Sequence, residues 1–91
     1  MTILIEIPHA ISRYSDDQTA VHLEGSTVGE VLKTLWERFP KLESRVLDRE
    51  GNFHPYLLLF HNDWKLPRSG FTDQPVREGD RLEIVALAEG G

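Results

Sequence analysis

The sequence predicts an α+β fold, in which a mixed sheet of four to five strands carries one main helix across one face. Two short segments of alternating apolar residues, 2–7 and 81–87, have the period of half-buried strands. Between them, residues 28–39 repeat their apolar side chains with the period of an amphipathic helix. A chain of 91 residues has room for one small domain, so these elements are expected to share a single core.

The first expected strand covers residues 2–7, and its isoleucines share one face: Ile3, Ile5 and Ile7. Pro8 ends it, because proline cannot donate to a sheet ladder. The polar segment 9–18 is expected to be a long loop with a turn at residues 15–17. Residues 19–23 then form a second short strand, antiparallel to the first.

The main helix is expected to begin after Thr27, a good N-cap residue. Glu30 follows three residues later, so the pair is typical of a capping box. Apolar residues then recur on one stripe: Val28, Val31, Leu32, Leu35, Trp36 and Phe39. We interpret Trp36 as a core residue, since it lies on that stripe. Pro40 ends the helix near Phe39.

Shorter elements are expected in the second half of the chain. Residues 41–47 form one more helical turn that buries Leu42 and Val46. Residues 56–60 form a third strand, apolar on both faces, and residues 64–66 a brief fourth one. Residues 67–75 are expected to be irregular. The compact solution for this order places the first and last strands side by side and parallel, with the helix crossing one face.

Composition excludes several classes of function. The formal net charge of −5 disfavours nucleic acid as a partner, since phosphate binding needs clustered lysine and arginine. No apolar segment approaches the length of a membrane span. The chain has no cysteine, which removes disulfides, iron–sulfur clusters and thiol nucleophiles. Four histidines lack metal-ligand spacing, so no metal is expected: His9, His22, His54 and His61. No catalytic motif is present, and the expected compartment is the cytoplasm.

The last residues of the chain are the most informative. A turn at Gly79-Asp80 leads into the apolar strand 81–87, and the sequence ends at Gly90-Gly91. Two successive glycines form the thinnest peptide available, because they lack a Cβ atom. Such a tail is suited to a narrow channel in a partner, where it presents its carboxylate.

These features resemble those of the ubiquitin-like sulfur carriers, the MoaD/ThiS-like family. That family includes the molybdopterin-synthase small subunit and the sulfur carriers of thiamine and cysteine synthesis. The resemblance rests on the Gly79-Asp80 turn, the apolar last strand and the terminal glycine pair. It implies a ubiquitin-like β-grasp domain over residues 1–88, followed by a flexible tail at residues 89–91.

The resemblance also implies a function centred on Gly91. An E1-like adenylyltransferase uses ATP to adenylate the Gly91 carboxylate, a persulfide donor supplies sulfur, and the resulting thiocarboxylate passes to a sulfur-accepting enzyme. Gly90 keeps the tail thin enough to enter the partner. The chain is then a carrier and co-substrate, or the small subunit of a sulfur-transferring complex. It is not itself an enzyme, and it binds no cofactor. The residues do not distinguish the receiving pathway.

The outward face of the sheet is expected to dock the partner. If alternate residues face the helix, then Leu4, Leu58, Phe60, Val85 and Leu87 point outward. Apolar side chains on adjoining strands are typical of an interaction surface, and we assign partner binding to Leu58, Phe60, Val85 and Leu87. The alternative is a second small core beneath the segment 67–75.

Two other functions fit the same residues. A ubiquitin-like modifier would use the same activation and then join Gly91 to substrate lysines. A β-grasp interaction domain without catalysis would have an inert tail, and removal of Gly90-Gly91 would then have no consequence.

Overall fold

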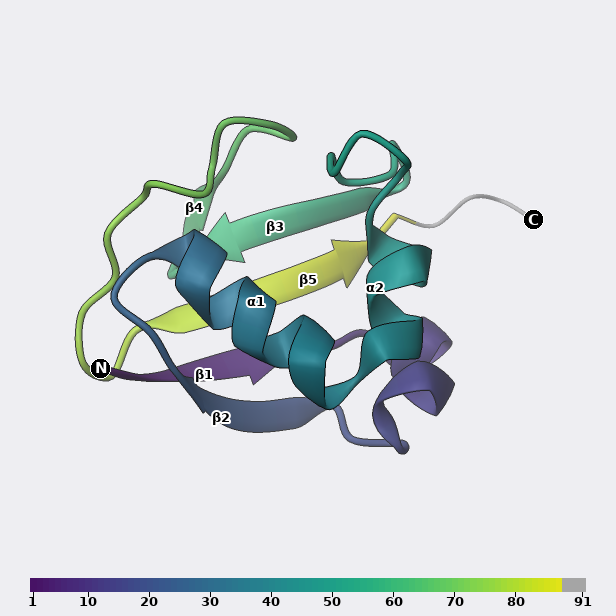
Figure 1. Ribbon diagram of the computed structural model, residues 1–91, viewed down its shortest axis with the longest axis horizontal. Helices are drawn as coiled ribbons and strands as arrows, with labels where there is room; N and C mark the ends of the chain where they lie inside the picture. The colour runs from purple at the N-terminus through teal and green to yellow at the C-terminus, as the bar shows by residue number, and fades with distance from the viewer. Residues whose placement is uncertain (88–91) are drawn as a thin grey trace.

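The structure is a computed structural model that describes residues 1–87. The predicted tail, with Gly90 and Gly91, lies outside the described residues, as does Ala88. In chain order the elements are β1 (Thr2–Glu6), the 3-10 helix η1 (His9–Ser15), β2 (Ala20–Glu24), α1 (Val28–Arg38), α2 (Pro40–Val46), β3 (Leu57–His61), β4 (Trp64–Lys65) and β5 (Arg81–Ala86) (Figure 1).

The strands form one mixed sheet in the order β2-β1-β5-β3-β4. The first and last strands, β1 and β5, are parallel and adjacent, with Ile5 opposite Leu82. Strand β2 pairs antiparallel with β1, and β3 pairs antiparallel with β5. This confirms the predicted β-grasp arrangement, although β2 and β3 each begin one residue later than the sequence pattern indicated.

Helix α1 buries the predicted stripe, because Val28, Val31, Leu32 and Leu35 are all buried. Trp36 is half-buried and packs against the core. Thr27 is the N-cap, and its hydroxyl oxygen accepts a hydrogen bond from the Glu30 N–H at 3.2 Å. The Glu30 carboxylate accepts from the Ser26 N–H at 2.8 Å, one residue earlier than in the capping box that the sequence predicted.

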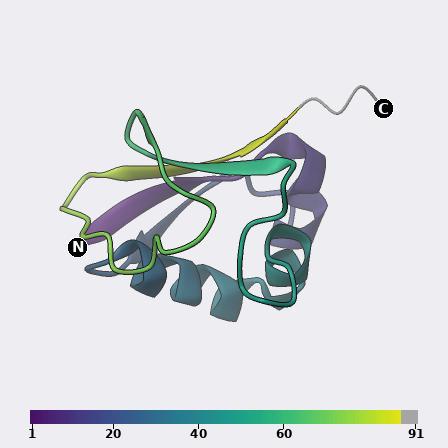
Figure 2. The same ribbon diagram turned by 90° about the horizontal axis from the view of Figure 1, so that it is seen from above.

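The irregular segment 67–75 closes the N-terminus of α1. The Val28 N–H donates to the Gln74 carbonyl at 2.8 Å and the Gly29 N–H to the Thr72 carbonyl at 3.0 Å, which satisfies two donors that a helix leaves free. Phe71 is buried in this segment. The segment thus lies on the helix side of the sheet (Figure 2), and the alternative of a second core beneath it on the outward face is wrong.

The segment 9–18 is not the loop that its polar residues predicted, because residues 9–15 form η1. Two buried serines hold it: the Ser12 hydroxyl donates to the His9 carbonyl and the Ser15 hydroxyl to the Ser12 carbonyl. Hydroxyl-to-backbone bonds of this kind satisfy polar groups that a loop would leave to water. The predicted turn is present at Asp16 and Asp17, both in the left-handed region with φ of 56° and 63°.

The core lies between the sheet and the helices, which cover one face of it (Figure 2). Helix α2 contributes Leu42 and Val46, both 0% exposed, as the sequence predicted. The other buried apolar residues are Ile3, Ile5, Ile7, Val21, Leu23, Val28, Val31, Leu32, Leu35, Phe39, Phe53, Leu57, Leu59, Leu66, Phe71, Val76, Leu82 and Ile84. The second face of the sheet carries no helix within residues 1–87.

Candidate functional site

The outward face of β3 and β5 carries the four residues to which the sequence assigned partner binding. We call Leu58, Phe60, Val85 and Leu87 the tail-root patch. Leu58 lies directly opposite Val85 in the antiparallel ladder. The buried residues of both strands alternate with less buried ones, as a half-covered sheet requires. Leu87 is 43% exposed. The outward direction is confirmed, while the binding role stays a prediction.

Leu4 also points outward, as predicted, but it is not continuous with this patch. The sheet register places Leu4 beside His22 on β2 and Arg81 on β5. Phe60 instead lies opposite Glu83. The outward residues of β5 between Leu4 and Phe60 are charged, namely Arg81 and Glu83. The apolar patch is therefore narrower than the one expected from the sequence, which included Leu4. It is confined to the end of the sheet from which the chain continues toward Gly91.

Tyr56 borders the tail-root patch and had no role in the sequence interpretation. The Leu87 N–H donates to the Tyr56 carbonyl at 2.8 Å. Tyr56 is 49% exposed, and its ring stacks on His54, with centroids 5.3 Å apart and an interplanar angle of 9°. The sequence could have indicated this, because Tyr56 stands two residues before Leu58 and alternation places both on the outward face. Exposed tyrosines are enriched at interfaces.

A cleft adjoins the patch where β1 ends and β5 continues. Its volume is about 390 Å³. The lining combines two carboxylates with apolar and backbone surface, from Glu6, Ile7, Pro8, Thr19, Glu83, Ile84, Val85 and Ala86. Glu6 and Glu83 lie opposite each other in the parallel ladder. Sequence reasoning missed this pair, because alternation shows that both point outward but not that they are neighbours.

At the other end of β5, a polar cluster joins its first residues to β3. His61 lies at the strand end, as predicted, and its Nε2 atom is 2.8 Å from Asp80 Oδ2. The same oxygen accepts from the Arg77 N–H at 2.9 Å. The hydrogen bond from His61, followed by that from Arg77, lowers the pKa of Asp80 below its usual value. Both side chains are mostly buried, so this cluster holds β5 in place rather than presenting a reactive group.

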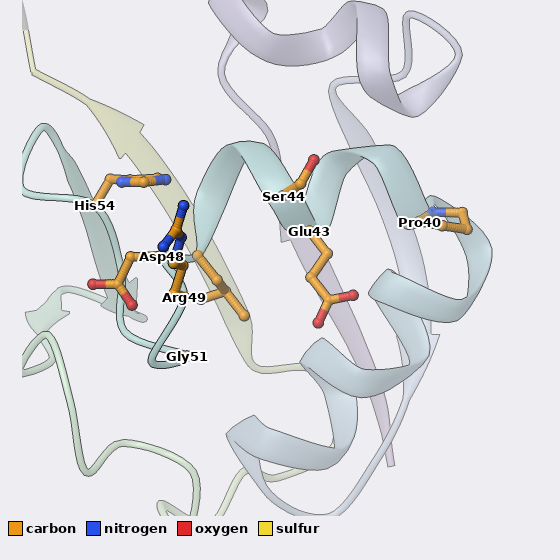
Figure 3. A pocket seen from close by; sticks show the side chains of 8 residues that line it. Pro40, Glu43, Ser44, Asp48, Arg49, Gly51 and His54 are labelled. Carbon is orange, nitrogen blue, oxygen red and sulfur yellow. The ribbon is translucent and has the colours of Figure 1, made fainter.

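A larger cavity, of about 570 Å³, lies beside α2 (Figure 3). Its lining carries charges of both signs, from Glu43, Asp48 and Arg49, and also includes His54. Asp48 Oδ1 already accepts two backbone hydrogen bonds, from Glu50 at 2.8 Å and Asn52 at 3.0 Å. These bonds, that from Asn52 foremost, lower the pKa of Asp48. The carboxylate therefore stabilises the loop after α2.

The described residues offer no metal cluster. Within residues 1–87, no three His, Cys, Asp or Glu side chains gather closely enough to hold a metal ion. None of the helices in this part of the chain has the length and apolar character needed to cross a membrane. The catalytic assignments of the sequence, Gly90 and Gly91, fall on residues that the structure does not describe.

Known proteins resemble the chain along its whole length. The "Sulfur carrier protein CysO" of Mycobacterium tuberculosis is 25% identical over 93 residues that cover 100% of both chains. The crystal structure of the Amycolatopsis orientalis BexX/CysO complex contains a chain that matches with a TM-score of 0.84 and 26% identity, over 98% of this chain and 99% of that one.

The fold extends to more distant proteins. SAMP1 from Haloferax volcanii matches over 100% of both chains with a TM-score of 0.82 and 20% identity, which shows a shared fold. The model of the ThiS family matches residues 5–91. That match runs from the end of β1 through the other four strands and both α-helices, and it includes the terminal glycine pair. The chain therefore belongs to the ThiS family.

Proposed function

We propose that the chain is a sulfur carrier whose Gly91 carboxylate becomes a thiocarboxylate. One observation carries the proposal: the ThiS family model matches the chain through residue 91, and Gly90-Gly91 follow the tail-root patch after only two residues. The relatives named above include a sulfur carrier, CysO. This family consists of small carrier proteins rather than catalytic enzymes. The main polar clusters described above within residues 1–87 have a structural role. Asp48, His61 and Asp80 are engaged in structural hydrogen bonds.

The proposed chemistry begins with activation, because a carboxylate is a poor electrophile. The terminal carboxylate has a reference pKa of about 3.3–3.7 and is ionised at neutral pH. An E1-like adenylyltransferase joins it to the AMP of ATP and releases pyrophosphate. The terminal sulfur of a persulfide then attacks the acyl carbon, and AMP leaves. A thiol reduces the resulting acyl disulfide and frees the thiocarboxylate, which a sulfur-accepting enzyme consumes.

We assign this chain two tasks in that sequence. The tail-root patch provides apolar surface for the adenylyltransferase, next to the strand that leads to Gly91. The hydrogen bond from Leu87 to Tyr56 fixes the point from which the remaining residues extend. We propose the cytoplasm as the compartment, where ATP is available to the partner.

Intact-protein mass spectrometry tests the proposal. The purified chain is incubated with ATP, a sulfide source and the E1-like enzyme encoded in the same genome. We expect a gain of about 16 Da, the exchange of one oxygen for sulfur at an activated acyl group. A chain without Gly91 is the control and should gain no mass. A wild-type chain that remains unchanged with every E1-like enzyme of its genome contradicts the carrier function.

The same samples test the modifier alternative, which starts from the same acyl-adenylate. The likeness to SAMP1 shows the fold alone and does not favour either function. Conjugation to lysines produces a ladder of heavier species on a denaturing gel, whereas a carrier returns to its free mass once an acceptor removes the sulfur.

A further inference from the structure

The last residues of β5 have a strand partner on one side and none on the other within residues 1–87. Pairing between β1 and β5 ends at Glu6 and Glu83. Beyond that point, the Ile7 N–H donates to the Thr19 carbonyl, toward β2, and Pro8 has no N–H to offer. Beyond the Glu6–Glu83 pair, the β1 side of β5 is therefore an open strand edge at Ala86.

The direction of the backbone groups identifies which ones are free. The Leu87 N–H donates toward β3, whereas the Asp80 carbonyl accepts from Leu4 on β1. Backbone groups alternate in direction along a strand, so even-numbered residues of β5 address the β1 side. The N–H and carbonyl of Ala86 therefore face the cleft. Unpaired groups on a strand edge are a template for another strand.

Charge specifies what the edge can receive. Glu6 and Glu83 line the cleft beside the open backbone. Arg81 is shared between two carboxylates, with its Nε atom 3.3 Å from Glu6 Oε1 and its Nη2 atom 3.3 Å from Asp63 Oδ1. Glu83 forms no ion pair with any residue in the described part of the chain. The cleft thus holds more negative than positive charge, in a protein whose net charge is −5.

We infer that this cleft receives an extended segment of the activating enzyme, which pairs with the open edge at Ala86 and places an arginine or lysine side chain at Glu6 and Glu83. Main-chain hydrogen bonds supply affinity when a strand is added to a sheet edge, and the flanking side chains supply specificity. A cation there forms a charge-assisted hydrogen bond with Glu83. The inference rests on the proposed function for the identity of the partner.

Such pairing has a consequence for the tail. The segment would hold β5 on its second side, one residue before Leu87. Both edges of the strand would then be fixed at the point where the chain leaves the sheet, so the direction of the tail toward the nucleotide would be set before chemistry begins.

Hydrogen exchange of single backbone amides tests the strand pairing. The Ala86 amide should exchange rapidly in the free protein and at least about tenfold more slowly when the activating enzyme is bound, because the bound segment provides an acceptor. The Leu87 amide, already bonded to Tyr56, is the internal control. An Ala86 amide that exchanges equally fast in the complex overturns the inference.

Charge substitutions test the side-chain contact. We expect Glu83→Gln to raise the Kd for the activating enzyme about tenfold at low salt, and Glu6→Gln to raise it less, because Arg81 already neutralises part of Glu6. The matched control is Glu37→Gln, which removes the same charge from the exposed side of α1. The difference between wild type and Glu83→Gln should shrink at high salt.

The two proposals fail in different ways. If the wild-type chain gains no sulfur, the proposed function fails. If it gains sulfur while Glu6→Gln and Glu83→Gln bind as tightly as Glu37→Gln, the carrier function stands and the cleft inference is wrong.

Discussion

The Leu87 N–H donates a hydrogen bond to the Tyr56 carbonyl at 2.8 Å, one residue beyond the end of β5. The β3–β5 ladder therefore extends to Leu87, which under the proposed function is the base from which Gly91 reaches a partner. Four residues follow Leu87 in the sequence. Fully extended, they span at most about 14 Å, so the partner's reactive site must lie within that distance of the docked sheet.

Shortening this reach should abolish sulfur loading. Deletion of Gly91 removes about 3.5 Å of chain, and a misplacement of about 1 Å already lowers reaction rates about 100-fold. Gly90→Val should fail as well, through side-chain bulk and restricted φ. We expect both variants to keep the wild-type melting temperature, while intact mass shows no gain. Normal loading of either variant contradicts the proposed threading of the tail.

Phe60→Asp should weaken binding to the activating enzyme while the domain stays folded. Phe60 is half-buried on the outward face, and a carboxylate there places an unpaired charge in an apolar interface. Calorimetric titration should show a Kd raised at least tenfold, about 1.4 kcal/mol or more. His22→Asp, outward on β2 and outside the tail-root patch, is the control. If the isolated Phe60→Asp variant unfolds, then Phe60 belongs to the core and the patch is misassigned.

Leu35→Ala should lower the free energy of unfolding by about 2–5 kcal/mol. Leu35 is 0% exposed at the centre of the α1 stripe, so truncation leaves a cavity. Urea titration measures the loss. Lys33→Ala, on the exposed side of the same helix, should change stability by no more than about 0.5 kcal/mol. Equal effects of the two substitutions are incompatible with this packing.

Gly29→Ala should destabilise the protein, although alanine is ordinarily favoured over glycine within a helix by about 1 kcal/mol. A Cβ atom at Gly29 would lie 2.9 Å from both the Cβ atom and the carbonyl oxygen of Thr72. The carbonyl is held there by the Gly29 N–H itself, so the segment 67–75 must shift. A higher melting temperature for Gly29→Ala would mean that this segment moves without cost.

Asp80 should contribute stability that is lost in acid. Its pKa is lowered in the folded protein, by the hydrogen bond from His61 first and that from Arg77 next. A lowered carboxyl pKa stabilises the fold fully above the unfolded-state value of about 3.9, and the contribution disappears as pH falls through the folded-state value. The difference in unfolding free energy between wild type and Asp80→Asn should thus be largest near neutral pH and shrink below pH ~4. A difference independent of pH contradicts this role.

Periodic features were predictable from the sequence, whereas cross-strand neighbours were not. The α1 stripe and the alternation in β1 and β5 follow from local spacing. The parallel pairing of β1 with β5 could also be predicted, because it gives the most compact sheet for one helix to pack against. Helix η1 escaped prediction because the hydroxyl bonds of Ser12 and Ser15 leave no periodic pattern. The Glu6–Glu83 pair joins residues 77 positions apart and depends on a register that no local pattern encodes.

The parallel pairing of β1 with β5 also governs when the protein can fold during its synthesis. The centre of the sheet joins one of the first segments to leave the ribosome to one of the last. Until residues 81–86 emerge, β1 and β3 lack the strand that separates them, and the face of α1 has no complete sheet to cover. Contacts of such high sequence separation form slowly. The core is therefore completed only once residues 81–86 are free to pair, so a chain interrupted before β5 has no folded domain to which a partner could dock.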